Sequence, residues 1–169
     1  MNTKKYSIDE VGIRLVKERK LYSTERISSP EVVLKVLADF MRDFDREVVY
    51  VVNLTAQFSP INVNCVSTGT LNNALFHPRE IFKSAILSNA TGIMILHVHP
   101  SGYALPSPED IRVTDRIVKA GDIVGIDVID HVIVGANNFF SFRQNSMLKD
   151  NGYVYCKSVD EIRFSSYNS

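Results

Sequence analysis

Three short apolar runs place the strongest constraint on the fold of this chain. They are residues 47–54 (EVVYVVNL), 93–99 (IMILHVH) and 126–134 (IDVIDHVIV). Runs of this length that are rich in Val and Ile are typical of strands covered on both faces. A sheet made of such strands needs helices packed against each face, so the sequence predicts an α/β fold.

The segments between these runs predict three helices. Each helix is expected to begin where a proline follows a capping residue, at residues 28–31, 77–80 and 107–110. The first helix should fade by residues 43–45, and the third should stop at Gly121. Their apolar residues recur at helical spacing.

Two further short segments predict antiparallel pairing. Residues 61–66 alternate between apolar and polar side chains, and the turn near 57–60 connects them to the first apolar run. Residues 139–142 follow Asn137 and Asn138 as a short returning strand. Hairpins within an alternation of strands and helices favour a mixed β-sheet flanked by helices.

The length of 169 residues predicts a single domain. Residues 1–29 are expected to form a tail with a leading strand at 11–17, where Val11, Ile13 and Leu15 alternate. The domain itself is predicted over 30–149. Residues 150–169 are polar and are expected to form a loosely held C-terminal tail.

Charge and composition exclude several classes of protein. Nineteen basic and nineteen acidic residues give a formal net charge of zero, which argues against nucleic-acid binding but leaves a local basic patch open. No apolar run approaches the roughly 20 residues that cross a bilayer, so no membrane partner is expected. Cys65 and Cys156 form no CxxC pair. These features predict a cytoplasmic protein.

The segment with the clearest chemical content contains two histidines on one strand. Side chains at i and i+2 of a strand share a face, so His97 and His99 are able to meet at one point. Seven residues then lead to Ser107, and two more lead to Asp110. Two imidazoles and a carboxylate form a three-ligand set suited to Zn²⁺, with a fourth position left for water. Ser107 would be placed to stabilise an oxyanion.

A structural explanation exists for each part of this pattern. Ser107, Pro108 and Asp110 are also the N-cap, first residue and first-turn acid of an ordinary helix start. A lone His-x-His at a strand end is more often incidental than a metal site. The metal hypothesis therefore rests on the combination: two histidines on one face, a loop, and a helix whose first turn carries an acid.

These residues resemble the JAMM (JAB/MPN) metalloprotease motif, which has His-x-His, seven residues, Ser, two residues and Asp. The words "HPREIFKSAI", "HVHPSG", "PSPEDI", "VTDRIVKAG" and "GIDVIDHVIVG" resemble the RadC-like branch of that family. The resemblance covers residues 30–149. It implies a mixed sheet akin to that of cytidine deaminases, a Zn²⁺ cofactor, and cleavage of a peptide or isopeptide bond by a metal-activated water.

The resemblance also implies a glutamate that acts as general acid and base. In RadC-like sequences it follows an arginine at the start of a strand, and this position corresponds to Glu47 here. Glu80 competes for the role, but its place in a helix start gives it a capping explanation. Members of the family usually have Asn where this chain has Val98. Ligation is expected to survive that change, because the side chain of Val98 points to the other face.

Full-length RadC proteins carry an N-terminal helix-hairpin-helix region. About forty residues precede Glu47 here and contain no such pattern, so the chain is similar to a short form. Two histidines lie outside the motif. His77 is expected at a helix entrance, and His131 is expected in a strand; each is expected to be an ordinary core or surface residue. A role for His131 around the metal ligands, and one for Ser101 in lining the site, remain open.

Three functions compete at this point. The first is a zinc hydrolase that uses His97, His99 and Asp110 as ligands, with Glu47 and Ser107 as catalytic residues. The alternative is a non-catalytic module that acts in DNA repair, recombination or mobile-element function. The third is a metal-dependent nuclease, which would need more acids and histidines than the sequence assembles. The substrate and the oligomeric state are not predicted.

Overall fold

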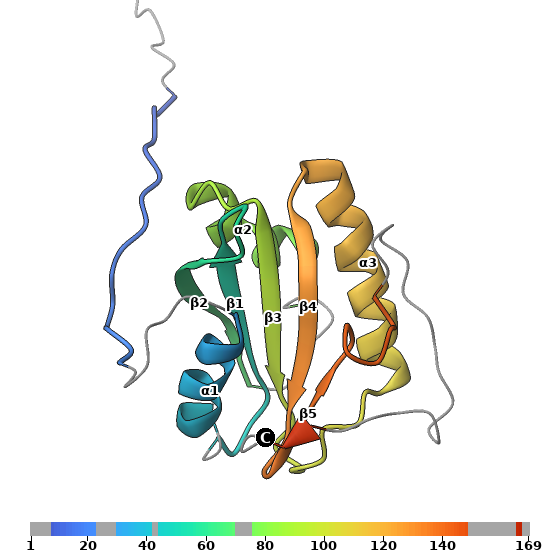
Figure 1. Cartoon of the computed structure of the whole chain (residues 1–169). Coiled ribbons are helices and arrows are strands. Elements are labelled where there is room, and N and C mark those ends of the chain that lie inside the picture. Colours follow the sequence, from blue (N-terminus) through green and yellow to red (C-terminus); the bar gives the residue numbers. More distant parts are fainter. Residues whose placement is uncertain (1–7, 23–29, 42–43, 70–75, 149–164, 167–169) are drawn as a thin grey trace, which may run out of the picture.

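The computed structural model describes residues 8–22, 30–41, 44–69, 76–148 and 165–166, without the side chains of residues 30, 31, 38, 39, 165 and 166. Six strands form one sheet in the order β2-β1-β3-β4-β5-β6 (Figure 1). The strands are β1 (Val48–Leu54), β2 (Pro60–Thr68), β3 (Gly92–Val98), β4 (Asp127–Val134), β5 (Asn138–Ser141) and β6 (Ser165–Ser166).

The sheet is mixed, as predicted. Strands β3 and β4 are parallel, and the other neighbouring pairs are antiparallel. The predicted hairpin joins β1 to β2, and the amide of Thr55 donates to the carbonyl of Ser59 (2.9 Å) within its turn. The parallel pair is connected through a helix, which is the connection that parallel neighbours require.

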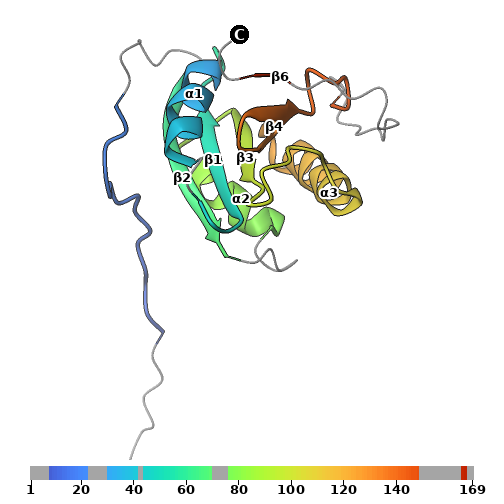
Figure 2. The same ribbon diagram turned by 90° about the horizontal axis from the view of Figure 1, so that it is seen from below.

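Three helices cover the two faces of the sheet. Helix α1 (Pro30–Met41) lies on one face, and α2 (Pro78–Leu87) and α3 (Pro108–Val124) lie on the other (Figure 2). The predicted N-cap of α1, Ser29, falls outside the described residues. The alternation of side chains along β1 explains why both faces need cover, since Tyr50 packs beneath α1 whereas Val51 packs on the side of α2.

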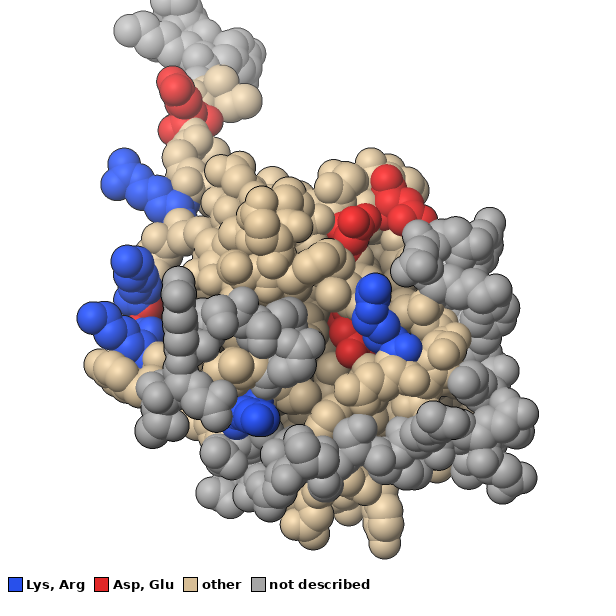
Figure 3. Space-filling view, viewed as in Figure 1, with Lys and Arg blue, Asp and Glu red and all other residues tan. Residues whose placement is uncertain are grey.

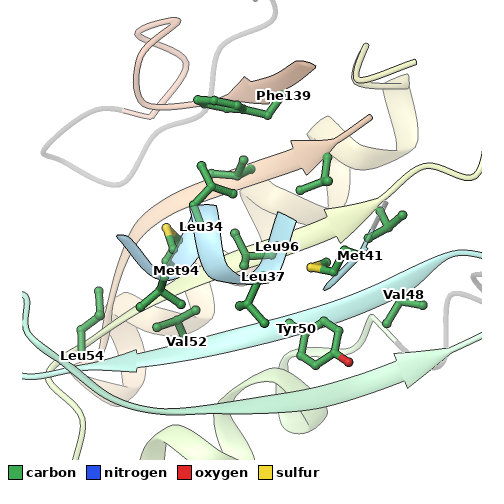
Figure 4. Close-up of a cluster of buried hydrophobic side chains, with 14 residues drawn as sticks. Leu34, Leu37, Met41, Val48, Tyr50, Val52, Leu54, Met94, Leu96 and Phe139 are labelled. Carbon is green, nitrogen blue, oxygen red and sulfur yellow. The ribbon is translucent and has the colours of Figure 1, made fainter. Parts of the chain in front are cut away.

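The core has a separate apolar cluster on each face. The α1 face contains Leu37 and Met41 of the helix against Tyr50, Val52 and Leu96 of the sheet (Figure 4). The opposite face joins α2 and α3 to the odd-numbered residues of β1 and β3. The nearly continuous apolar runs in the sequence therefore reflect strands buried on both sides, as expected for strands sandwiched between helices.

Helix α3 is longer than predicted. Gly121 lies inside the helix, and the C-cap is Gly125, whose φ of 72° is the left-handed conformation that glycine adopts at low cost. A Cβ at Gly121 would lie 2.5 Å from the carbonyl oxygen of Ile126. The glycine therefore serves close packing of the helix against the chain that enters β4, and it does not end the helix.

The predicted leading strand at 11–17 is wrong, and most of the predicted C-terminal tail lies outside the described residues. Residues 8–22 form no strand, because the alternating apolar residues at 11–17 have no strand beside them among the described residues. In the region expected to be a loose C-terminal tail, Ser165 and Ser166 pair with Phe139 and Asn138 of β5. Pairing at a sheet edge uses backbone groups, which polar side chains do not prevent.

No helix in the parts of the chain that the structure describes has the length and apolar character to cross a membrane.

Candidate metal centre

The first histidine of the pair is held in the middle of the sheet. His97 is fully buried on β3, where it pairs with Val49 of β1 on one side and Ile133 of β4 on the other. Its side chain lies on the α2 and α3 face, whereas Val98 packs into the α1 cluster. The expected orientation of Val98 away from the histidines is therefore confirmed.

The second histidine lies one residue beyond the end of β3. The amide of His99 still donates to the carbonyl of Val134 (3.0 Å), so the sheet fixes the backbone at this point. The chain then turns sharply, because the amide of Gly102 donates back to the carbonyl of His99 (3.0 Å). A Cβ at Gly135 would lie 2.6 Å from the carbonyl oxygen of Gly102. A glycine at the end of β4 is therefore needed for this loop to pack closely.

The third candidate ligand is presented by the first turn of α3. Ser107 is the N-cap and forms a capping box with Asp110, as the helix-start pattern predicts. The hydroxyl of Ser107 accepts from the amide of Asp110 (3.2 Å). Oδ2 of Asp110 accepts from both the amide (2.7 Å) and the hydroxyl (2.6 Å) of Ser107. The capping box therefore fixes the orientation of the carboxylate and turns Oδ1 toward His97.

These three residues converge. His97, His99 and Asp110 each offer one ligand atom, and the three atoms lie within 4.8 Å of one another. Nδ1 of His97 lies 3.2 Å from Oδ1 of Asp110, and Nε2 of His99 lies 3.6 Å from Oδ2. Two histidine nitrogens and a carboxylate oxygen in one place are a donor set that suits Zn²⁺ and related divalent metals.

The hydrogen bonds of the histidines leave nitrogen atoms free for a metal. Nδ1 of His99 lies 3.0 Å from the carbonyl oxygen of Tyr103. A carbonyl only accepts, so this nitrogen carries the proton and Nε2 keeps its lone pair. Neither ring nitrogen of His97 has a hydrogen-bond partner, because the 3.2 Å approach to Asp110 lacks hydrogen-bond geometry. A buried polar atom in this state is costly, and a bound metal would remove the cost at the coordinating nitrogen.

The electrostatics of the cluster keep the carboxylate ionised. Burial by itself would raise the pKa of Asp110, but the imidazoles of His97 and His99 and the hydroxyl of Ser107 hold that pKa well below its ordinary value. Burial likewise lowers the pKa of His99, but the neighbouring Asp110 outweighs burial and the pKa is raised overall. An anionic carboxylate between two imidazoles is an arrangement that a cation would stabilise.

The predicted general base lies beside this cluster. Glu47 is half-buried and immediately precedes β1. The pairs Val48–Val98 and Val49–His97 continue the antiparallel register so that Glu47 falls at the level of His99, on the same face of the sheet. The charge of Glu47 contributes to raising the pKa of His99. The backbone is held too, since Gly69 donates its amide to the carbonyl of Glu47 (2.9 Å).

A buried group beneath the ligands was not assigned from the sequence. His131 of β4 is fully buried, with its ring centroid 5.9 Å from that of His97 and 4.8 Å from that of Phe142. The hydroxyl of Thr114 donates to the carbonyl of Asp110 (2.5 Å) and lies 2.7 Å from Nδ1 of His131. Since Thr114 has one hydroxyl proton, Nδ1 of His131 is the donor in that contact. Burial lowers the pKa of His131 to about 3, so the ring is neutral.

Thr114 and His131 therefore link α3 to β4 directly behind two of the three ligands. The sequence offered one signal for this link, the "DHVIVG" segment, but the spacing did not show where the imidazole would point. The helical position of Thr114, four residues after Asp110, places its hydroxyl on the preceding turn of α3.

Three other polar residues considered from the sequence lie outside the cluster. His77 is the N-cap of α2, as expected for a helix entrance, and its Nδ1 accepts from the amide of Arg79 (3.2 Å). Glu80 forms ion pairs with Arg79 and Lys83 on the surface of α2. Ser101 is exposed, and its hydroxyl accepts from the amide of Tyr103 (3.4 Å). Helix capping therefore accounts for His77, and ion pairing at the start of α2 accounts for Glu80.

Comparison with known proteins supports the resemblance. A model of the RadC-like JAB domain matches residues 27–147. A UPF0758 protein of Desulfitobacterium hafniense is 43% identical over 122 residues, covering 72% of this chain and 54% of the relative. One of Moorella thermoacetica is 44% identical over 122 residues, and one of Thermotoga maritima is 38% identical over 139 residues. These alignments cover 72% and 82% of this chain, and 53% and 62% of the relatives.

The chain thus spans little more than half the length of these curated relatives. The family model nevertheless covers strands β1 to β5, the three helices and all three candidate ligands. The match over this range and the identities near 40% show that the chain belongs to the RadC-like JAB domain family.

Proposed function

We propose that this protein is a zinc-dependent hydrolase that cleaves a peptide or isopeptide bond. The observation that carries the proposal is the convergence of His97, His99 and Asp110 within 4.8 Å. Membership of the RadC-like JAB domain family supports it. The unpartnered nitrogens of His97 and the free Nε2 of His99 fit a metal ion better than a purely structural cluster.

The three ligands leave room for reaction chemistry. A closed structural zinc site normally has four protein ligands, whereas a catalytic site has three and keeps one position open. In such a site Zn²⁺ supplies Lewis-acid activation of water near neutral pH. The residues of this chain must therefore orient the ligands, handle the proton of the attacking water, and stabilise negative charge on the substrate oxygen.

Glu47 is proposed to handle the proton. Its position at the level of His99, on the same face as the ligands, allows its carboxylate to accept a proton from the attacking water. The same carboxyl group then donates that proton to the nitrogen that leaves when the C–N bond breaks. A partly buried carboxyl group beside a metal ion suits both steps, because it can accept the proton from water and donate it to the leaving nitrogen without moving.

Ser107 is proposed to stabilise the developing oxyanion, but it has a prior task. Its hydroxyl proton is directed at Oδ2 of Asp110 over 2.6 Å. Donation to a substrate oxygen therefore requires the hydroxyl to rotate away, and the amide of Ser107 would remain as the donor to Asp110. Ser107 thus combines a positioning role toward Asp110 with the proposed contact to substrate.

The first test is the metal content of the purified, untagged chain. About one zinc per wild-type chain is expected. The His97→Ala/His99→Ala variant is expected to lose that zinc while its circular dichroism spectrum stays folded. His77→Ala is the matched control, because it removes a histidine outside the cluster. Wild-type protein that binds no zinc, even when zinc is offered, would rule the proposal out.

The second test separates catalysis from metal binding. The wild type is assayed for hydrolysis of peptide and isopeptide libraries next to Glu47→Gln, which keeps the size of the side chain but cannot take the proton. Loss of hydrolysis with zinc still bound supports the proposal. Hydrolysis at the wild-type rate would refute the role of Glu47. Zinc bound without any hydrolysis by the wild type would instead favour a non-catalytic module in DNA repair, recombination or mobile-element function.

A further inference from the structure

The N-terminal segment of residues 8–22, here called the arm, runs along the outside of the domain as an extended chain (Figures 1 and 2). Its large apolar side chains are exposed to water: Ile8 is 97% exposed, Val11 78%, Ile13 73% and Val16 82%. Burying such a side chain completely is worth about 1.5–3 kcal/mol. The arm therefore carries a considerable free energy of burial that the fold of one chain does not use.

One end of the arm is fixed to the domain. The guanidinium of Arg19 donates to the hydroxyl of Tyr50 (3.2 Å) and lies 4.2 Å from the centroid of the Phe40 ring. Leu21 packs against the apolar cluster beneath α1. These contacts hold residues 19–21 at the level of Tyr50, which pairs with Cys65 of β2. The rest of the arm extends from this fixed point.

The nearest sheet edge is suited to pairing with such a segment. β2 is the first strand in the sheet order, and among the described residues its only strand partner is β1. None of its nine residues is Lys, Arg, Asp or Glu. Proteins usually protect exposed edges with charges, short strands or bulges turned outward, so a long uncharged edge is a site for pairing with another chain.

The arm is too long for the edge of its own sheet. Residues 8–18 span roughly 36 Å when extended. From Cys65, the strand partner of the Tyr50 that Arg19 contacts, β2 continues for five residues to Pro60, or roughly 17 Å. Figure 1 shows the arm running past the end of the sheet. The two large apolar residues farthest along the chain from the fixed end are Ile8 and Val11, which are 97% and 78% exposed.

We propose that two copies of this chain exchange their arms, each arm pairing along the outer edge of β2 in the other copy. The arm supplies β-branched residues that favour a strand, and the outer edge of β2 supplies backbone groups that no other described strand pairs with. The arm of one copy and the β2 edge of the other are therefore suited to pair. Reciprocal exchange closes a two-fold dimer and leaves neither edge open. None of the residues of the arm or of β2 is a candidate metal ligand, and the proposal does not depend on the proposed hydrolase activity.

The first test measures mass by size-exclusion chromatography with light scattering over a range of micromolar concentrations. The wild type is expected at twice the 19.0 kDa of the chain. Val11→Asp/Ile13→Asp is expected to be monomeric, because it places two charges on the arm. Ile123→Asp is the control, since Ile123 is 86% exposed on α3, and it should remain dimeric. A monomeric wild type, or a dimer that the arm variant leaves intact, would overturn the proposal.

The second test locates the contact by cross-linking to Cys65, an exposed free cysteine of β2. In a Cys156→Ser background, cysteine is introduced in turn at Val11, Ile13 and Leu15, and each protein is oxidised. At least one variant should form a disulfide-linked dimer on a non-reducing gel, while Ile123→Cys should not. Monomers in all three variants, with or without an internal disulfide, would show that the arm does not reach a second copy.

Discussion

Replacing Ser107 with alanine tests how the capping box holds the candidate ligand Asp110. The substitution removes the hydroxyl that accepts from the amide of Asp110 (3.2 Å) and donates to its Oδ2 (2.6 Å). Loss of an N-cap costs about 1 kcal/mol. Loss of a hydrogen bond to a charged group costs about 1.5–3 kcal/mol, reduced here because the amide of Ser107 still donates to Oδ2.

The expected change in the free energy of unfolding is therefore about 2–3 kcal/mol. For a chain of this size the melting temperature should fall by roughly 5–10 °C, which thermal denaturation followed by circular dichroism would measure. Zinc affinity should fall by roughly 10–100-fold, since the carboxylate loses the contacts that orient it. A competition titration with a chromophoric chelator would measure that change.

Two matched variants make the result interpretable. Ser107→Thr keeps the hydroxyl and should restore most of the stability and zinc affinity. Ser101→Ala removes a hydroxyl from the exposed loop beside His99 and should change neither quantity. The reasoning is refuted if Ser107→Ala melts at the wild-type temperature and binds zinc as tightly as the wild type. A loss of hydrolysis with unchanged zinc affinity would instead assign Ser107 to the substrate alone.

Three further predictions concern the fold. In a urea titration, Gly121→Ala should lower the free energy of unfolding by about 1–3 kcal/mol, because its Cβ would lie 2.5 Å from the carbonyl oxygen of Ile126. Gly12→Ala is the control and should leave that free energy unchanged, because no atom lies within 4 Å of the added Cβ. Leu37→Ala should lower the free energy of unfolding by about 2–5 kcal/mol, because this side chain of α1 is fully buried against the sheet. A smaller loss would show that the cavity collapses. Burial raises the pKa of Asp130 to about 6 from an ordinary 3.8, so the folded chain keeps a proton that the unfolded chain loses, and the contribution of Asp130 to stability falls as pH rises between these values. Asp130→Asn should remove this falling contribution, so the slope of the free energy of unfolding against pH becomes more positive between these values, and an unchanged slope would contradict the assignment to Asp130.

Charge distribution bears on the nucleic-acid alternative. On the face shown in Figure 3, the Lys and Arg side chains of the described residues lie at several separate places with Asp and Glu between them. This fits the formal net charge of zero and offers no broad basic surface on that face.

Local patterns were sufficient to predict much of the site. The i, i+2 spacing of His97 and His99 places both side chains on one face of any strand, whatever surrounds it. The Ser107-Pro108 pair starts a helix through its own capping chemistry, which also directs the carboxylate of Asp110. These features depend on contacts within a few residues of the chain. The resemblance to RadC-like sequences then supplied Glu47, which no local pattern singled out.

Other features depend on contacts between distant segments, which periodicity does not encode. The antiparallel register of β1 and β3 brings Glu47 to the level of His99 across fifty-two residues of chain. The packing of β4 against α3 places His131 behind the ligands, although its sequence fits a core or a surface position equally well. The arm shows the converse, because its strand-like alternation yields no strand within a single chain, where none of the described strands pairs with it. A strand forms only when another chain segment satisfies its backbone, and the tertiary structure decides whether one is there.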